Sequence, residues 1–381
     1  MMDPEVSVLL HCADWRGLQE SHLKVELSER FNRQTDAALE RHIEEVWTER
    51  VSKEPWLFNG PKFRLHSFCL ASTQHPSSPA YASPKHPACT HSATAPSLDC
   101  VQGQNRLDQR NKSISPTEKV EGDVHPAAST LDQASSACRK AQLPPHSVEH
   151  TDDEDAAPLL TLRLGLTCYK DYLGTNWSRR VAELRQRGGA EFSDPLALLA
   201  QPLGVAAVLC TDDGQLVLIR RSQRVAEAEG LLDVPGGHPE PQVVCERLGR
   251  AACEEISMVA MQQRPEAVVS ELFAAVCAEI RDEVNVPLSC LGDPVLMGVA
   301  LNHTSAGRPS AEFYVSCSLT SDEVRELYWK GGAEAHESTD IVFLSRAEVL
   351  QLDRSSPLWS ELCPSAKGAV LLYQTVKPDG E

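Results

Sequence analysis

The sequence lacks the marks of several large protein classes. Its thirteen cysteines form no CxxC pair, which excludes the usual zinc-finger and thioredoxin-like spacings and indicates reduced thiols. No run approaches the roughly 18 apolar residues of a membrane span, and the acidic start of the chain lacks the basic flank of a secretory signal. We therefore expect a soluble protein in a reducing compartment, either the cytoplasm or the nucleus.

Basic side chains are also scarce. The chain holds 36 lysines and arginines against 54 aspartates and glutamates, which gives a formal net charge of −18. A charge of this sign and size repels phosphate backbones and anionic lipid. The composition therefore predicts neither a nucleic-acid partner nor a membrane partner.

Strong core-forming residues are nearly absent between Ala71 and Pro158. These 88 residues contain ten of the 25 prolines but only nine leucines, isoleucines, valines or phenylalanines. Burial of so few apolar side chains would not offset the conformational entropy lost on folding. Residues 71–158 are therefore predicted to be a disordered low-complexity insert. The segments on either side, 63–70 and 159–169, alternate apolar and polar residues and should pair as a hairpin with the insert at its tip. Ser115-Pro116 makes a phosphorylatable tether one hypothesis for the insert.

The remaining residues alternate between strand and helix patterns. We expect an N-terminal α/β domain formed by residues 1–70 and 159–202, followed by a second domain over residues 203–381. The strands are predicted at 6–10, 63–70, 159–169, 205–210, 216–220, 295–301, 311–318 and 341–344, and the helices at 35–50, at 177–187, from 321 and from 365. Strands and helices in this order favour the α+β class, arranged as an α/β/α sandwich.

Two features of residues 233–286 carry chemical information. The segment DVPGGHPEP is a strand end that runs into a double-glycine turn, where a backbone can approach an anion closely. Downstream, an apolar stripe at helical spacing should face the core; it comprises Val269, Leu272 or Phe273, Val276, Ile280 and Val284. On the adjoining face Glu279 and Glu283 lie one turn apart. Such a pair of carboxylates favours binding of a hard cation such as Mg²⁺.

The turn and this helix resemble the signature of the Nudix hydrolases, Gx5Ex7REUxEExGU. The segment AEIRDEVNV keeps two of its glutamates as Glu279 and Glu283, and it has Ala278, Asp282 and Asn285 in place of the arginine, the middle glutamate and the glycine. A rival alignment needs no insertion and uses Gly236, Gln242, Arg250, Glu254, Glu255 and Met258. We favour the later helix, because the rival has lost the first carboxylate of the metal-binding run.

Longer blocks, among them WLFNGPKFRLH, GLTCYKDYLGTNW and LNHTSAGRPSAEFYVSCSLT, are similar to the branch of Nudix hydrolases that cleaves UDP-glucose and UDP-galactose. The resemblance implies that residues 203–381 form a Nudix domain with a degenerate box and that Glu279 and Glu283 bind Mg²⁺. It also implies a set of residues that contact the nucleotide sugar: Phe58, Tyr169, Arg221, Ala226, Asp233, His238, Glu240 and Ser365. Chemically, Phe58 and Tyr169 suit stacking on a base, although core aromatics would look the same. Arg221 suits a pyrophosphate, and Ser365 equally suits a helix N-cap.

The predicted reaction is Mg²⁺-dependent hydrolysis of the UDP-glucose or UDP-galactose pyrophosphate to UMP and hexose 1-phosphate, a step of pyrimidine salvage. The general base is Glu279, Asp282 or Glu240, and spacing alone does not choose among them. Two alternatives stay open. One is a Nudix hydrolase of another nucleoside diphosphate derivative such as ADP-ribose, and the other is a nucleotide-sugar binding protein without turnover.

Overall fold

The computed structural model describes residues 3–71, 159–223, 225, 227–250 and 256–380, which all belong to one compact unit. Apart from Ala71, the predicted insert lies outside the described residues, and so do Ala226, Glu254 and Glu255. Within the part of the chain that is described, no helix is long and apolar enough to cross a membrane.

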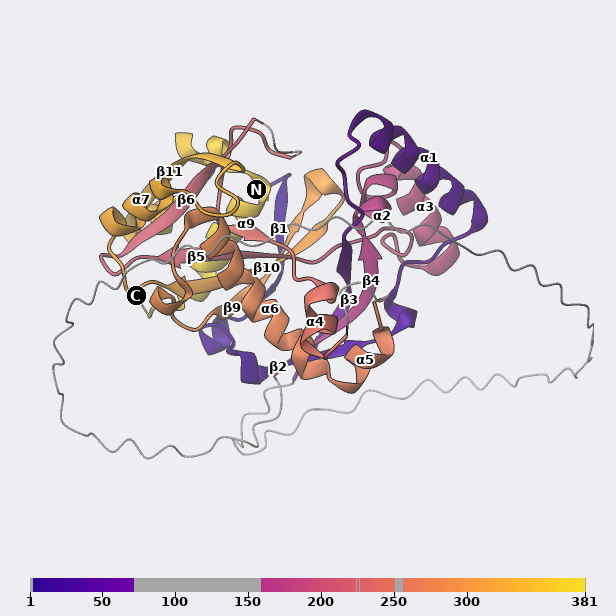
Figure 1. The fold of residues 1–381 in the computed structure, drawn as a ribbon, viewed down its shortest axis with the longest axis horizontal. Helices are drawn as coiled ribbons and strands as arrows, with labels where there is room; N and C mark the ends of the chain where they lie inside the picture. The colour runs from indigo at the N-terminus through magenta and orange to yellow at the C-terminus, as the bar shows by residue number, and fades with distance from the viewer. Residues whose placement is uncertain (1–2, 72–158, 224, 226, 251–255, 381) are drawn as a thin grey trace, which may run out of the picture. The chain divides into compact units, whose positions relative to one another are not determined.

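A large mixed sheet forms the centre of the fold (Figure 1). Its strands run in the order β1 (Val6–His11), β9 (Val295–Asn302), β10 (Arg308–Ser316), β5 (Gly204–Cys210), β6 (Gln215–Arg221) and β11 (Ser338–Ser345). Two short strands, β7 (Leu232–Asp233) and β8 (Gly236–Gly237), pair with β6 and β5. Only the β5–β10 pair is parallel among those on the main path. The first strand, β1, therefore joins the sheet built mainly by residues 203–381.

Apolar residues cover both faces of this sheet. Along β5, Val205, Ala207 and Leu209 point into a core shared with helix α6 (Pro265–Glu279). The alternate residues Ala206 and Val208 point into a second core shared with helix α9 (Pro364–Val376). Because successive side chains of a strand point to opposite faces, helices cover the sheet on both sides. The predicted α+β class and the α/β/α layering are confirmed.

A second sheet of three strands has the order β2 (Leu23–Leu27), β4 (Leu160–Cys168) and β3 (Pro61–Leu70). The predicted hairpin of β3 and β4 is confirmed, and the Ala71 N–H donates to the Leu159 carbonyl at 2.8 Å where the two strands meet the insert. Strand β2 was not predicted and runs parallel to β4. Its residue Val25 shares a core with α6. The small sheet therefore packs on α6.

The other helices are α1 (Ala37–Lys53), α2 (Tyr169–Gly174), α3 (Val181–Phe192), α4 (Pro241–Arg247), α5 (Met258–Gln263), α7 (Ser321–Lys330) and α8 (Arg346–Gln351). The predicted start of α1 at residue 35 was two residues early, because the Asp36 side chain caps the helix by accepting from Ala38 and Leu39 N–H. Helix α3 begins later than the predicted residue 177. The Trp177 ring stacks on Tyr172 instead, with centroids 5.8 Å apart.

Helix α6 continues into a π-helical turn, Ile280–Val284, that ends at Asn285. The predicted stripe is buried throughout, from Val269 to Val284. Asn285 takes the left-handed conformation with φ 65°, and its side-chain amide donates to the Leu327 carbonyl at 2.8 Å. Asparagine tolerates this conformation better than most residues, which explains how it replaces the signature glycine.

Candidate active site

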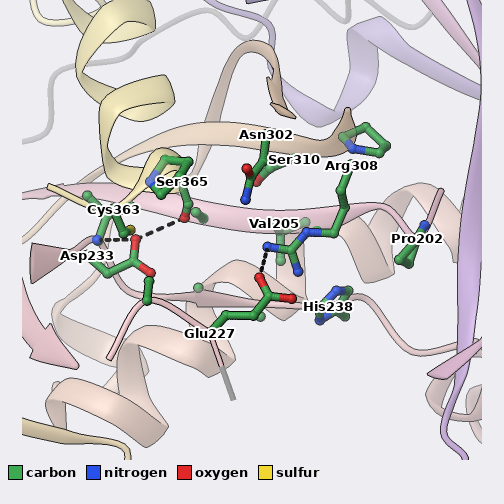
Figure 2. A pocket seen from close by; sticks show the side chains of 18 of the residues that line it. Pro202, Val205, Glu227, Asp233, His238, Asn302, Arg308, Ser310, Cys363 and Ser365 are labelled. Atoms are coloured by element: carbon green, nitrogen blue, oxygen red, sulfur yellow. Dashed lines mark hydrogen bonds and ion pairs between the residues drawn. The ribbon is translucent and has the colours of Figure 1, made fainter. Parts of the chain in front are cut away.

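A cavity of about 490 Å³ opens beside the end of β5 (Figure 2). Strand β3 contributes Lys62 and helix α2 contributes Tyr169 and Tyr172. The Gly236–Gly237 turn forms part of its wall, and Ser365 at the start of α9 lies on another side. Residues far apart in the chain therefore meet at one cavity.

Glu279 and Glu283 lie directly behind the glycine turn. The Gly236 N–H donates to Glu283 Oε2 at 2.8 Å, and the backbone of His238 bonds to the Glu279 carboxylate. A Cβ atom at Gly237 would lie 2.0 Å from Glu279 Oε1, so no larger residue fits there without movement. Neither glutamate is among the residues that line the cavity, but both touch the turn that does. The turn and the π-helical segment thus form one structural feature.

The two carboxylates are crowded with negative charge. Burial, followed by the nearby Glu334 carboxylate, raises the pKa of Glu279 to about 7. Burial, followed by the charge of Glu279, raises the pKa of Glu283 well above its ordinary value. In the Nudix signature an arginine stands where this chain has Ala278. The nearby cation that favours ionised Glu279 is instead the Lys62 ammonium, which comes from β3. Like charges held this close favour binding of a further cation.

Asp233 is the centre of a polar cluster at the start of α9. Its Oδ2 lies 3.1 Å from Arg221 Nη1, and its Oδ1 accepts from the Ser365 hydroxyl at 2.9 Å. Figure 2 shows the Asp233 and Ser365 side chains directed at each other. Arg221 also donates through Nε to the Glu227 carbonyl at 3.1 Å. Asp233 therefore fixes both a cation and a hydroxyl at the cavity wall.

Aromatic and charged side chains form another wall. The Tyr172 hydroxyl donates to Glu227, whose other oxygen lies 3.2 Å from Arg308 Nη2, an ion pair visible in Figure 2. The Tyr169 ring stacks on Tyr172 with centroids 6.4 Å apart. Burial and the charge of Lys62 hold the pKa of His238 well below its usual range, so its imidazole is neutral. The cavity thus offers aromatic faces, cations and neutral hydrogen-bonding groups together.

Comparison with known proteins assigns the family. No family model matches the sequence. The chain is 41% identical over 376 residues to the protein named uridine diphosphate glucose pyrophosphatase NUDT22 of Bos taurus, covering 99% of each chain. It is 40% identical over 376 residues to the Homo sapiens protein of the same name, covering 99% of this chain and 94% of that one. The chain belongs to the NUDT22 family. A solved Nudix hydrolase structure from Alicyclobacillus acidocaldarius matches 46% of this chain and 91% of its own, with 12% identity and a TM-score of 0.30.

Membership of the NUDT22 family confirms the resemblance to Nudix hydrolases, which typically use divalent metal ions. Among the described residues, no three His, Cys, Asp or Glu side chains are placed to enclose an ion. The donor set at Glu279 and Glu283 nevertheless fits Mg²⁺, which commonly takes one or two protein carboxylates and completes its shell with water and substrate phosphates. A hard divalent ion would also offset the mutual repulsion of these two groups.

The structure brings five of the sequence-predicted substrate residues to the cavity: Tyr169, Arg221, Asp233, His238 and Ser365. Others lie elsewhere. Phe58 is 78% exposed and does not line the cavity, and Ala226 lies outside the described residues. Ser365 is not the N-cap of α9, since Cys363 holds that position.

The remaining two predicted residues do not line the cavity, and each makes an ion pair. Asp282 is held by the Arg281 guanidinium, with Nη2–Oδ2 at 2.6 Å, and it does not line the cavity. Glu240 is about half exposed and faces Lys62 across 3.9 Å. The three base candidates therefore differ in setting, and Glu279 is the one in direct contact with the glycine turn.

Sequence reasoning missed several residues of the cavity, namely Lys62, Tyr172, Trp177, Glu227, Arg308, Ser310 and Glu312. One available signal was the alternation of polar residues at 308, 310 and 312. The predicted strand began only at 311, whereas β10 begins at Arg308 and includes all three. Alternate residues of a strand share a face, so these three were candidates for one site.

Proposed function

We propose that this chain hydrolyses the pyrophosphate bond of UDP-glucose or UDP-galactose, with Mg²⁺, to give UMP and hexose 1-phosphate. The observation that carries the proposal is the pair of buried carboxylates, Glu279 and Glu283, held against the glycine turn of a cavity. Relatives at 40% to 41% identity over nearly the whole chain are named for UDP-glucose pyrophosphatase activity, which supports this substrate class.

Glu279 and Glu283 would hold the Mg²⁺ ion, which would neutralise diphosphate oxygens and orient the attacking water. The chain's own residues then bind and position the substrate. Arg221, fixed by Asp233, presents guanidinium N–H groups suited to phosphate oxygens. Tyr169 offers a face for the base, where stacking contributes about 1–3 kcal/mol, and the buried Tyr172 ring packs against it. Since burial holds the pKa of Glu279 at about 7, metal binding should release a proton near neutral pH.

The substrate class is tested with purified wild-type protein and a panel of UDP-glucose, UDP-galactose, ADP-ribose and a nucleoside triphosphate. Released UMP, AMP and sugar phosphate are resolved by chromatography with and without Mg²⁺. We expect UMP and hexose 1-phosphate from the UDP-hexoses, at a kcat/KM at least tenfold above that for ADP-ribose. Preferential release of AMP from ADP-ribose would contradict the proposal, as would tight UDP-glucose binding without any UMP.

A further inference from the structure

Glu312 is a buried carboxyl group in the middle of a sheet, and none of the roles above uses it. Its side chain is 0% exposed, and neither of its oxygens has a hydrogen-bond partner among the described residues. The Ser310 hydroxyl lies near it but does not reach hydrogen-bond geometry. Leaving a buried polar group unpaired costs about 1–3 kcal/mol, so proteins rarely keep one without a function.

The strand directs Glu312 toward the cavity. Along β10, Arg308, Ser310 and Glu312 all line the cavity, whereas Ala311 and Phe313 between and beyond them belong to the core under α6. Figure 2 shows the Arg308 and Ser310 side chains on this wall. The carboxyl group thus belongs to the substrate-facing side of the sheet.

Helix α9 closes the opposite approach to this carboxyl group. At Gly368 an added Cβ would lie 2.6 Å from the Ala300 Cβ and 3.8 Å from Glu312 Oε1, so the helix packs close against the strand. The cavity is therefore the direction from which a partner can reach the carboxyl group. In either protonation state a carboxyl group keeps an acceptor oxygen, so a hydrogen-bond donor is a missing partner in both states.

We infer that Glu312 is a specificity-determining residue, which accepts a hydrogen bond from an uncharged O–H or N–H group of the bound nucleotide sugar. The diphosphate carries no donor, so it cannot supply the hydrogen bond that the acceptor oxygen of Glu312 lacks. The donor is a hexose hydroxyl, a ribose hydroxyl or the uracil imide N–H. The inference rests on the proposed function, since it takes a UDP-hexose as the occupant of the cavity.

Calorimetric binding in EDTA tests the inference without relying on catalysis. Wild type, Glu312→Met and Glu312→Gln are titrated with UDP-glucose and with analogues that each lack one donor: UDP-xylose, the 2′-deoxyribose form and CDP-glucose. Met matches the size of Glu without an acceptor, and Gln keeps one acceptor oxygen. Asp379→Asn is the control, a carboxyl group outside the cavity whose side chain is 8% exposed and pairs with Arg346.

We expect Glu312→Met to weaken UDP-glucose binding about 10- to 100-fold, with Glu312→Gln restoring most of it and Asp379→Asn unchanged. The penalty of Glu312→Met should vanish for UDP-xylose, the 2′-deoxyribose form or CDP-glucose when the contacted donor is the 6-hydroxyl, the 2′-hydroxyl or the imide N–H, respectively. A penalty that persists for all three assigns the contact to one of the remaining sugar hydroxyls. Equal binding of all four ligands by wild type and Glu312→Met would overturn the inference. Wild-type protein that binds none of them in EDTA and also releases no UMP from UDP-glucose with Mg²⁺ would overturn the proposed function, and this inference with it.

A crystal structure of the wild-type protein with UDP-glucose tests the contact between Glu312 and the ligand without any substitution. We expect one ligand O–H or N–H group within about 3.2 Å of a Glu312 carboxyl oxygen. A ligand bound in the cavity with no donor at that distance would refute the role of Glu312 while leaving the proposed function intact.

Discussion

At the scale of single residues, the site is defined by carboxyl groups that differ in what surrounds them. Asp233 has a guanidinium and a hydroxyl as partners, Glu283 has a backbone N–H, and Glu312 has no hydrogen-bond partner among the described residues. These differences separate a structural anchor from the proposed metal ligand and from the proposed substrate contact. They also determine how the two glutamates respond to pH.

Glu312 makes the free protein less stable as pH rises. Burial raises its pKa to about 8 in the folded state, from an ordinary value of 4.5, so the folded state holds a proton that the unfolded state has lost between these values. The free energy of unfolding should therefore fall between about pH 4.5 and pH 8, by at most about 1.4 kcal/mol per pH unit. Urea unfolding of wild type and Glu312→Gln across this range measures the effect.

We expect the stability of Glu312→Gln relative to wild type to increase steadily toward pH 8. If the free energies of unfolding of the two proteins differ by the same amount at every pH, then folding does not raise the pKa of Glu312. Asp379→Asn again serves as the control.

At the scale of elements, the glycine turn and the π-helical segment must fit closely to hold the carboxylate pair. We predict that Gly237→Ala lowers kcat for UDP-glucose about 10- to 100-fold, because the added Cβ would lie 2.0 Å from Glu279 Oε1 and displace that carboxylate. Gly189→Ala on α3 is the control, since its added Cβ has no neighbour closer than Pro195 Cγ at 3.9 Å. Steady-state kinetics and thermal unfolding are measured on both.

The control variant should keep wild-type kcat and gain up to about 1 kcal/mol of stability from better helix propensity. Full activity of Gly237→Ala would mean that the position of Glu279 behind the turn does not matter for turnover.

The elements that the sequence predicted well are those with a clear period. Alternation identified β3 and β4, and helical spacing identified the buried stripe of α6. The six-residue α2 was missed because fewer than two helical turns give too weak a period to stand out. The five-residue β2 was also missed, although its alternation of apolar and polar residues was a usable signal.

The candidate site divides in the same way. Glu279 and Glu283 are neighbours on one helix, so their spacing was enough to bring them together. Lys62 and Glu312 reach the cavity through sheet pairing between distant segments, such as β10 beside β5, and local sequence carries no record of that pairing. An unpartnered buried carboxyl group can be recognised only when its surroundings are known.

At the scale of the whole molecule, the described residues on both sides of the insert form one compact unit. Ala71 and Leu159, the described residues on either side of the insert, are joined by a backbone hydrogen bond of 2.8 Å. We predict that deletion of residues 74–152, which leaves a short connection between the same two strands, keeps kcat for UDP-glucose within about twofold. Shortening the loop by roughly three doublings should raise the free energy of unfolding by about 2 kcal/mol.

Activity and urea unfolding of the deletion protein check both parts. A collapse of kcat, or precipitation of the shortened protein, would mean that the removed residues contribute to the folded unit. Unchanged kcat would direct the search for a role of Ser115-Pro116 to partners rather than to catalysis.

The most direct test of the central claim measures Mg²⁺-dependent release of UMP from UDP-glucose by wild type, Glu283→Gln and Glu266→Gln. Glu266 is an exposed glutamate in the first turn of α6, so it controls for loss of a carboxylate from the same helix. We predict that Glu283→Gln lowers kcat about 100-fold or more and that added Mg²⁺ no longer stimulates it, while Glu266→Gln matches wild type. Full Mg²⁺-stimulated turnover by Glu283→Gln would contradict the account.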